Sequence, residues 1–343
     1  MYKQNSLFKN YFNLSNRRYI GNKQKLLNWI FENIEKECKN IEIFSDIFAG
    51  TGVVSLEAIK RYKKIIINDF LYSNNIIYKA FFYQEEFDID KLQKLVEYFN
   101  KLNPKNLEDN YFSNYYGDKY FSDDSAKIIG FVRDYIEKIE LNQKEYAILI
   151  ASLIYSIDKI ANTVGHYDAY FKKTKIEDKF FMKLIQPIKT TKKIEIYKND
   201  ANFLAKEIKT DIVYIDPPYN SRQYSRFYHL LENLVKWDKP KLYGVALKPE
   251  PENISDYCKV SAKNKLNELV SDIDTKYIAL SYNNTYKSKS KSSQNKISLD
   301  EIKEILNKKG STKIYKIDYQ QFTTGKTDFE NHQEYLFITK VKK

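Results

Sequence analysis

The sequence predicts an α/β protein with a doubly wound, mostly parallel sheet, a largely helical insertion and a late antiparallel hairpin. Three observations support this fold class. Residues 41–69 give a short apolar segment, a glycine-containing turn, a helical segment and a second apolar segment. This order is typical of a parallel sheet with right-handed crossovers. Apolar segments that end in turns return after residue 190, and residues 125–160 between them carry apolar side chains at helical spacing.

The elements follow from local patterns of apolar residues and turn formers. In the first part, the periodicity and the glycines predict a helix that begins soon after Gly21, a strand at 41–44, a turn at 46–52, a helix at 53–60 and a strand at 65–67. Later apolar runs predict strands within 192–197, 211–215, 276–284, 311–320 and 334–341. The last two strands are expected to form the hairpin. We therefore expect residues 1–75 and 190–343 to form one domain and residues 76–189 to form the insertion.

Composition and charge exclude several classes of protein. Lys and Arg number 57 against 45 Asp and Glu, a net charge of +12 that suits a polyanionic partner such as nucleic acid. A lysine-rich background composition is the plainer explanation of the same charge. No apolar run is long enough to span a membrane, and no apolar leader precedes residue 10. Two cysteines and three histidines, all scattered, favour neither disulfides nor a metal site. A soluble, cytoplasmic protein without membrane contact is expected.

A glycine turn is the first motif with chemical meaning. Residues 46–52 read Asp-Ile-Phe-Ala-Gly-Thr-Gly, between a predicted strand and a predicted helix. Two glycines there allow a tight turn and a close approach of a ligand to the backbone. Ser55 stands where a nicotinamide-binding fold has a small third residue, and no phosphate-binding loop motif occurs. Asp69 ends the next strand, where a carboxylate can accept hydrogen bonds from ribose hydroxyls.

The second motif is Asp-Pro-Pro-Tyr at residues 216–219, directly after an apolar strand. The two prolines lack backbone N–H groups and fix the local backbone, so the Pro217 carbonyl can point outward as an acceptor. Asp216 adds a carboxylate acceptor, and Tyr219 adds an aromatic ring. Two acceptors beside a ring suit an exocyclic amino group on a flat, stacked base.

Together these motifs resemble the S-adenosylmethionine-dependent amino-methyltransferases, which have a Rossmann-like core. The Asp-Pro-Pro-Tyr form is similar to that of adenine-specific DNA methyltransferases, and residues 18–23 resemble their N-terminal cofactor motif. Residues 220–224 and 228–232 look like the extension found in methyltransferases of restriction-modification systems. The order of the motifs resembles the alpha group, whose insertion recognises the target. The flanks 1–75 and 190–343 carry the likeness, and the insertion matches only at 162–170.

The resemblance implies roles for individual residues. Catalysis is assigned to Asp216, Pro217, Pro218 and Tyr219. Binding of S-adenosylmethionine is assigned to Tyr19, Gly21, Lys23, Asp46, Phe48, Ala49, Gly50, Thr51, Gly52, Asp69, Asp200, Ala201 and Phe203. The loop after residue 164 and the segment after the Asp-Pro-Pro-Tyr motif combine aromatic and basic residues, so DNA binding is assigned to His166, Tyr167, Tyr170, Lys172, Lys173, Arg222 and Arg226.

The expected reaction is sequence-specific methylation of the N6 amino group of adenine in duplex DNA, after the base is flipped out of the helix. Methylation of the cytosine N4 amino group has the same geometry of attack and is the first alternative. RNA or protein-amide methylation, a non-catalytic nucleic-acid-binding protein and a nicotinamide-dependent oxidoreductase are further alternatives. A cognate restriction endonuclease is an expected companion, and no oligomer is required.

Overall fold

The computed structural model describes residues 11–172, 175–285, 294–318 and 332–342. Contacts between Cα atoms divide the chain into two compact units. The sheet unit comprises residues 22–70, 191–224 and 253–343, and the helical unit comprises residues 1–21, 71–190 and 225–252. Each unit is described separately below.

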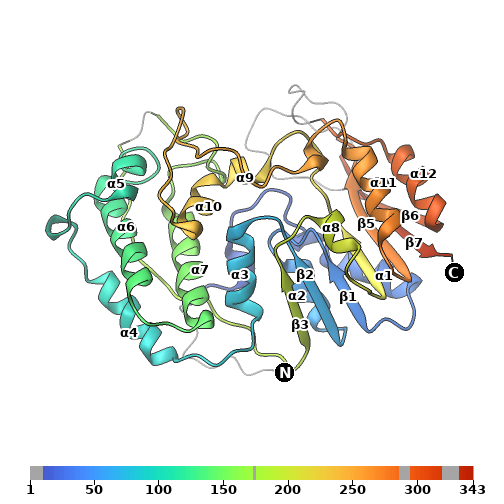
Figure 1. Cartoon of the computed structure of the whole chain (residues 1–343), viewed down its shortest axis with the longest axis horizontal. Coiled ribbons are helices and arrows are strands. Elements are labelled where there is room, and N and C mark those ends of the chain that lie inside the picture. Colours follow the sequence, from blue (N-terminus) through green and yellow to red (C-terminus); the bar gives the residue numbers. More distant parts are fainter. Residues whose placement is uncertain (1–10, 173–174, 286–293, 319–331, 343) are drawn as a thin grey trace. The chain divides into compact units, whose positions relative to one another are not determined.

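A seven-stranded sheet in the order β3-β2-β1-β4-β5-β7-β6 is the centre of the sheet unit (Figure 1). The first five strands pair in parallel, whereas β7 pairs antiparallel with both β5 and β6. The doubly wound, mostly parallel sheet and its late antiparallel pair are therefore confirmed. The strands are β1 (Ile43–Asp46), β2 (Lys64–Asn68), β3 (Lys193–Tyr197), β4 (Ile212–Ile215), β5 (Tyr277–Asn283), β6 (Gly310–Asp318) and β7 (Gln333–Val341).

The strand order reverses direction between β1 and β4. The chain runs from β1 outward through β2 to β3, and then returns to the other side of β1 with β4. Asp46 at the end of β1 lies beside Ile67 of β2 and Tyr214 of β4, so these three strands end at the same edge. In open parallel sheets, ligands bind at the carboxyl edge where the order reverses. Both motifs leave the sheet at this edge.

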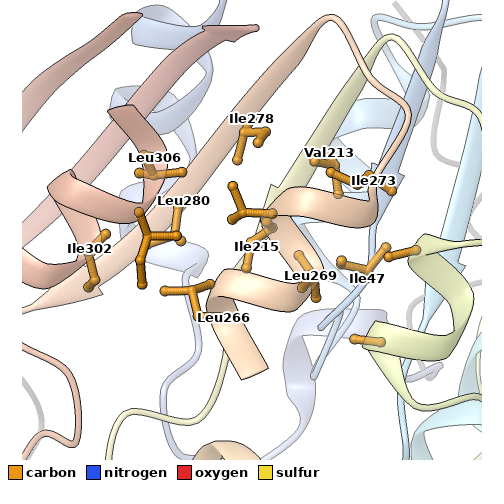
Figure 2. Packing of buried hydrophobic residues seen from close by; sticks show 14 of the residues in the cluster. Ile47, Val213, Ile215, Leu266, Leu269, Ile273, Ile278, Leu280, Ile302 and Leu306 are labelled. Atoms are coloured by element: carbon orange, nitrogen blue, oxygen red, sulfur yellow. The ribbon is translucent and has the colours of Figure 1, made fainter. Parts of the chain in front are cut away.

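Helices cover the sheet and supply its core. Figure 2 shows Leu266 and Leu269 of α11 with Ile302 and Leu306 of α12, packed beside apolar side chains of β4 and β5 such as Ile215. These residues are buried because each helix turns one apolar stripe toward the sheet. The helices of this unit are η3 (Gln24–Leu26), α1 (Leu27–Glu37), α2 (Val53–Ile59), α8 (Ala201–Ala205), η5 (Asp256–Cys258), α11 (Ala262–Asp272) and α12 (Leu299–Lys309).

The helical unit contains the long helices that the periodicity of residues 125–160 predicts. Its helices are η2 (Leu14–Asn16), α3 (Tyr72–Phe82), α4 (Ile89–Asn100), η4 (Pro104–Asn106), α5 (Tyr111–Tyr116), α6 (Asp123–Lys138), α7 (Gln143–Ile160) and α10 (His229–Lys236). The short helix α9 (Tyr224–Phe227) crosses the boundary between the units. Helix α7 is buried along nearly its whole length, which matches its apolar sequence.

The division differs in its boundaries from the domains expected from sequence. Residues 11–21 and 225–252 belong to the helical unit rather than to the sheet unit. For the second segment, the reason is visible in α10, where Leu230, Leu231 and Leu234 are buried and Glu232 accepts hydrogen bonds from the first backbone N–H groups of α3. The assignment of the helical part to target recognition stays a prediction. Among the described residues, no helix is long and apolar enough to cross a membrane.

Candidate active site

The glycine turn after β1 depends on two left-handed backbone positions. Gly50 has φ 52° and Gly52 has φ 78°, a region that favours glycine. The Gly52 N–H donates to the Ala49 carbonyl over 2.7 Å, which closes the turn. The carboxylate of Asp69, at the end of β2, accepts a hydrogen bond from the Gly50 N–H at 2.9 Å. This hydrogen bond therefore connects the glycine turn directly to Asp69, the residue predicted to bind ribose.

Asp46 is fully buried under this turn. Its Oδ2 accepts a hydrogen bond from the Ser55 hydroxyl at 2.7 Å, so the serine that replaces a small third residue serves the turn itself. Burial raises the pKa of Asp46 to about 7, and the nearby carboxylates of Asp216 and Asp69 act in the same direction. No donor within the described part of the chain reaches its buried Oδ1.

Asn68 is a residue of this site that sequence reasoning missed. Its amide donates to the carbonyls of Ile47 and Asn199, both at 3.0 Å, and its Oδ1 accepts from the Asn199 N–H at 2.9 Å. A buried side chain thus ties the loops after β1 and β3 to the end of β2. The only sequence signal was its position at a strand end.

The remaining predicted cofactor residues of the sheet unit surround the turn or follow β3. The exposed Asp200 caps α8, because its Oδ1 accepts from the N–H groups of Asn202 and Phe203. Phe203 is 59% exposed, so its ring is open to a partner. The Phe48 ring meets Tyr257 edge-on at 5.1 Å between centroids. Three other predicted cofactor residues are buried within the fold: Ala49, Thr51 and Ala201.

Asp216 of the Asp-Pro-Pro-Tyr segment interacts with neighbouring side chains through one of its two carboxylate oxygens. Oδ1 of Asp216 accepts a hydrogen bond from the Tyr219 hydroxyl and lies 3.3 Å from the Lys23 ammonium. Lys23 also donates to the Tyr219 hydroxyl at 2.8 Å. No hydrogen bond or ion pair to Oδ2 of Asp216 is seen among residues 11–172, 175–285, 294–318 and 332–342. The two carboxylate oxygens therefore differ in their partners within the described chain.

The Pro217 carbonyl is a second acceptor in the same segment. Within the described residues nothing donates a hydrogen bond to the Pro217 carbonyl, whereas the Tyr219 carbonyl accepts from the Lys296 N–H at 2.8 Å and from the Tyr282 hydroxyl at 3.3 Å. The loop is thus fixed by its last residue. The Tyr219 ring lies 4.5 Å from the Tyr282 ring at an interplanar angle of 55°, and the Lys23 ammonium lies over it, 5.0 Å from its centroid.

A second acidic side chain, Glu334 of β7, completes this cluster. It is 2% exposed, and its Oε2 lies 3.7 Å from the Lys23 ammonium. Sequence reasoning missed Glu334, because a single glutamate in an apolar strand carries no motif. Burial, followed by the charge of Glu334, raises the pKa of Asp216, and Lys23 opposes that shift.

In the helical unit, Tyr19 of the predicted N-terminal cofactor motif lies in an aromatic cluster. The Tyr19 ring stacks on the Tyr228 ring at 4.7 Å and 6°. The guanidinium of the buried Arg17 lies within 5.0 Å of the Tyr19 ring. The Tyr228 hydroxyl accepts from the Ile20 N–H at 2.9 Å, and Gly21 follows with φ 82°. The structure therefore places Lys23 in the catalytic cluster and Tyr19 and Gly21 in the other unit.

The predicted DNA-binding loop divides into buried and exposed residues. Tyr167 is 2% exposed and donates to the carboxylate of Asp158 at 2.6 Å, so we withdraw it from the predicted DNA contacts. His166 stacks on Phe227 at 4.7 Å and stays partly accessible. Tyr170 is partly accessible and Lys172 is exposed, whereas Lys173 lies outside the described residues.

The two arginines after the Asp-Pro-Pro-Tyr motif differ in their surroundings. The partly buried Arg226 donates to the Pro249 carbonyl at 2.7 Å, and burial lowers its pKa. The Arg222 backbone accepts from the Cys258 thiol at 3.3 Å. Within the described parts of the chain, no group of three or more His, Cys, Asp or Glu side chains could hold a metal ion.

Comparison with known proteins decides the class of reaction. The family model of the D12 class N6 adenine-specific DNA methyltransferases matches residues 19–294. The chain belongs to this family. It is therefore a transferase that methylates the N6 amino group of adenine in DNA, and the expectation drawn from the two motifs is confirmed.

Curated relatives cover most of this D12 methyltransferase. Type II methyltransferase M.NlaIII from Neisseria lactamica is 31% identical, over 93% of this chain and 98% of that protein. M.CviAII from Paramecium bursaria Chlorella virus 1 is 30% identical, over 94% and 98%. M.FokI from Planomicrobium okeanokoites is 32% identical over 93% of this chain, which spans only 52% of that longer protein.

Proposed function

We propose that Oδ2 of Asp216 and the carbonyl of Pro217 hold the N6 amino group of the target adenine. The observation that carries this proposal is the asymmetry of the Asp216 carboxylate: Oδ1 is saturated by Tyr219 and Lys23, and Oδ2 is not. An amino group has two protons, and two acceptors next to each other at one loop can take both.

The methyl donor proposed for this site is S-adenosylmethionine, bound at the glycine turn. The donor set of the sheet unit suits it, because Asp69 and Asp200 offer carboxylates for hydroxyl and amino groups and the exposed Phe203 ring offers a flat surface. The buried Oδ1 of Asp46 would gain a partner from an ammonium group at the turn. When bound, this donor supplies a methyl group on a positively charged sulfur, so the chemistry needs no metal and no covalent enzyme intermediate.

The proposed catalytic task of the chain is to make a weak nucleophile stronger. The lone pair of an adenine amino group is delocalised into the ring. Acceptors at Asp216 and Pro217 would draw the nitrogen toward tetrahedral geometry and stabilise the positive charge that develops as the N–C bond forms and the bond between the methyl carbon and sulfur breaks. The nitrogen must then lose one proton. The half-buried Asp216, whose pKa is raised, is the proposed acceptor.

Access to the adenine requires that it leave the duplex, at a cost of a few kcal/mol in lost pairing and stacking. We propose that the Tyr219 ring stacks on the extrahelical adenine, a contact worth about 1–3 kcal/mol. His166, Tyr170, Lys172, Lys173, Arg222 and Arg226 stay proposed DNA contacts. Sequence-specific action beside a cognate restriction endonuclease is proposed from the type II names of the relatives. The proposed place of action is the cytoplasm, and the proposal requires no oligomer.

Methylation of genomic DNA from a host without methyltransferases, followed by single-molecule sequencing, tests this proposal. The expected result is N6-methyladenine in one fixed sequence context, only when S-adenosylmethionine is supplied. N4-methylcytosine, or modification without sequence context, would contradict the proposed target.

A further inference from the structure

A buried carboxylate stands behind the catalytic cluster. Glu334 lies in β7 opposite Asn283 of β5 and Ile317 of β6, and only 2% of its side chain is exposed. A carboxylate in such a place is costly unless a cation or hydrogen bonds compensate it. Its cationic neighbour is Lys23, and the His332 ring lies 3.6 Å from its other oxygen.

Lys23 connects this carboxylate to the reacting end of the site. The acceptors around its ammonium include the Tyr219 hydroxyl at 2.8 Å, Asp216 Oδ1 at 3.3 Å and Glu334 Oε2 at 3.7 Å. The Lys23 side chain is 6% exposed, so water does not replace a lost partner easily. If Glu334 loses its charge, the electrostatic attraction that helps to hold the ammonium beside Oδ1 of Asp216 becomes weaker.

The carboxylates of Asp216 and Glu334 both lie near the Lys23 ammonium, and their negative charge favours the positive charge that develops on the amino nitrogen. Glu334 also raises the pKa of Asp216, which favours uptake of the released proton. The titratable groups that act on Asp216 are Lys23, Tyr219, Glu334, Asp46 and Tyr214, and those that act on Glu334 include Lys23 and His332.

From this arrangement we infer that Glu334 is a positioning residue of the methyl transfer: it holds Lys23 against Oδ1 of Asp216 and so keeps Oδ2 turned to the target amino group. This inference rests on the proposed role of Asp216. Glu334 itself touches neither the base nor the methyl donor.

Glu334→Gln tests the inference, because it keeps the shape of the side chain and removes the charge. The measurements are the single-turnover rate of methyl transfer as a function of pH, and the dissociation constants for S-adenosylmethionine and duplex DNA. We expect a rate at least about tenfold lower with both constants within about twofold of the wild type. Glu268→Gln, which removes an exposed partner of Lys265, is the matched control and should leave all values unchanged.

The pH profile separates positioning from a structural role. Because Glu334 raises the pKa of Asp216, its neutralisation lowers that pKa, and the acid limb of the rate profile moves to lower pH. A Lys23→Met background should remove most of the effect of Glu334→Gln on the limiting rate, since that effect of Glu334 passes through Lys23. An unchanged rate, an unmoved acid limb, or additive effects of the two substitutions would overturn the inference.

Two further variants keep the test decisive. If Glu334→Gln does not fold, Glu334→Asp retains the charge on a shorter side chain, and the inference then requires a lower rate with an unmoved acid limb. An unchanged rate in Glu334→Asp would refute it in that case. Asp216→Ala separates a failure of the proposed function from a failure of the role of Glu334. Methyl transfer by Asp216→Ala would contradict the proposed function. An inactive Asp216→Ala together with a fully active Glu334→Gln would contradict only the role of Glu334.

Discussion

Lys23 and Tyr219 are 196 positions apart, yet the Lys23 ammonium donates to the Tyr219 hydroxyl at 2.8 Å. This contact joins the N-terminal motif to the Asp-Pro-Pro-Tyr motif inside the sheet unit. The resemblance assigned Lys23 to the cofactor, and the structure adds that the same ammonium lies 3.3 Å from Asp216. The electrostatics of the proposed reaction therefore depend on a residue from the other end of the chain.

Loss of the Asp216 carboxylate should abolish catalysis without abolishing cofactor binding. Asp216→Ala removes the proposed acceptor at the reacting nitrogen, and we expect the rate of transfer to fall by about 10²-fold or more. Asp216→Asn keeps the shape and one acceptor oxygen, so it should retain more activity than Asp216→Ala. Single-turnover transfer and equilibrium binding of labelled S-adenosylmethionine measure both effects. Equal losses of transfer and of cofactor binding would show that Asp216 has another role.

Removal of the buried cation should destabilise the protein. Lys23→Met leaves Asp216 and Glu334 close together without their ammonium, and a broken buried ion pair typically costs about 3–5 kcal/mol. Urea denaturation at neutral pH measures the free energy of unfolding. Lys265→Met, at an exposed ion pair, is the control and should change it by less than about 1 kcal/mol. A Lys23→Met protein as stable as the wild type would argue against a buried charged cluster.

Asp46 predicts a dependence of stability on pH. Its pKa is 3.8 in the unfolded reference and is raised to about 7 by burial in the folded protein. The folded state thus binds the proton more tightly, so this contribution to stability is fully present below pH 3.8 and is lost as pH rises through 7. Asp46→Asn removes the titrating group. The free energy of unfolding of the variant, minus that of the wild type, should therefore rise as the pH increases from 3.8 to about 7. Urea unfolding at a series of pH values measures this difference, and a difference that does not change with pH would contradict the prediction.

Features that depend on residues close together in the sequence could be predicted from it, whereas features that depend on distant partners could not. The buried strands β2 and β4 are continuous apolar runs, and the glycine turn needs φ values that only its glycines accept readily, so both can be read locally. Glu334 and Asn68 have roles set by partners from distant strands, and no local pattern marks them. Tyr167 and Tyr170 are indistinguishable in the sequence, because the partner that buries Tyr167, Asp158, is fixed only by the tertiary fold.

Binding of duplex DNA should weaken steeply with salt. The chain carries a net charge of +12, and each Lys or Arg that contacts a phosphate releases condensed counterions. The logarithm of the association constant should fall linearly with the logarithm of the salt concentration, with a slope of roughly −0.9 for each phosphate contacted. Fluorescence anisotropy of a labelled duplex measures the slope. Lys172→Ala should make the slope less negative by roughly 0.9, the value for one phosphate contact. A slope near zero would exclude a basic DNA-binding surface.

The adenine N6 atom is proposed to lie between Oδ2 of Asp216 and the Pro217 carbonyl. A crystal structure with a duplex that contains the target site and an unreactive analogue of S-adenosylmethionine tests this placement. We expect an extrahelical adenine whose N6 lies about 2.7–3.2 Å from both oxygens. An adenine that remains stacked in the duplex, or an N6 atom that contacts neither oxygen, would contradict it.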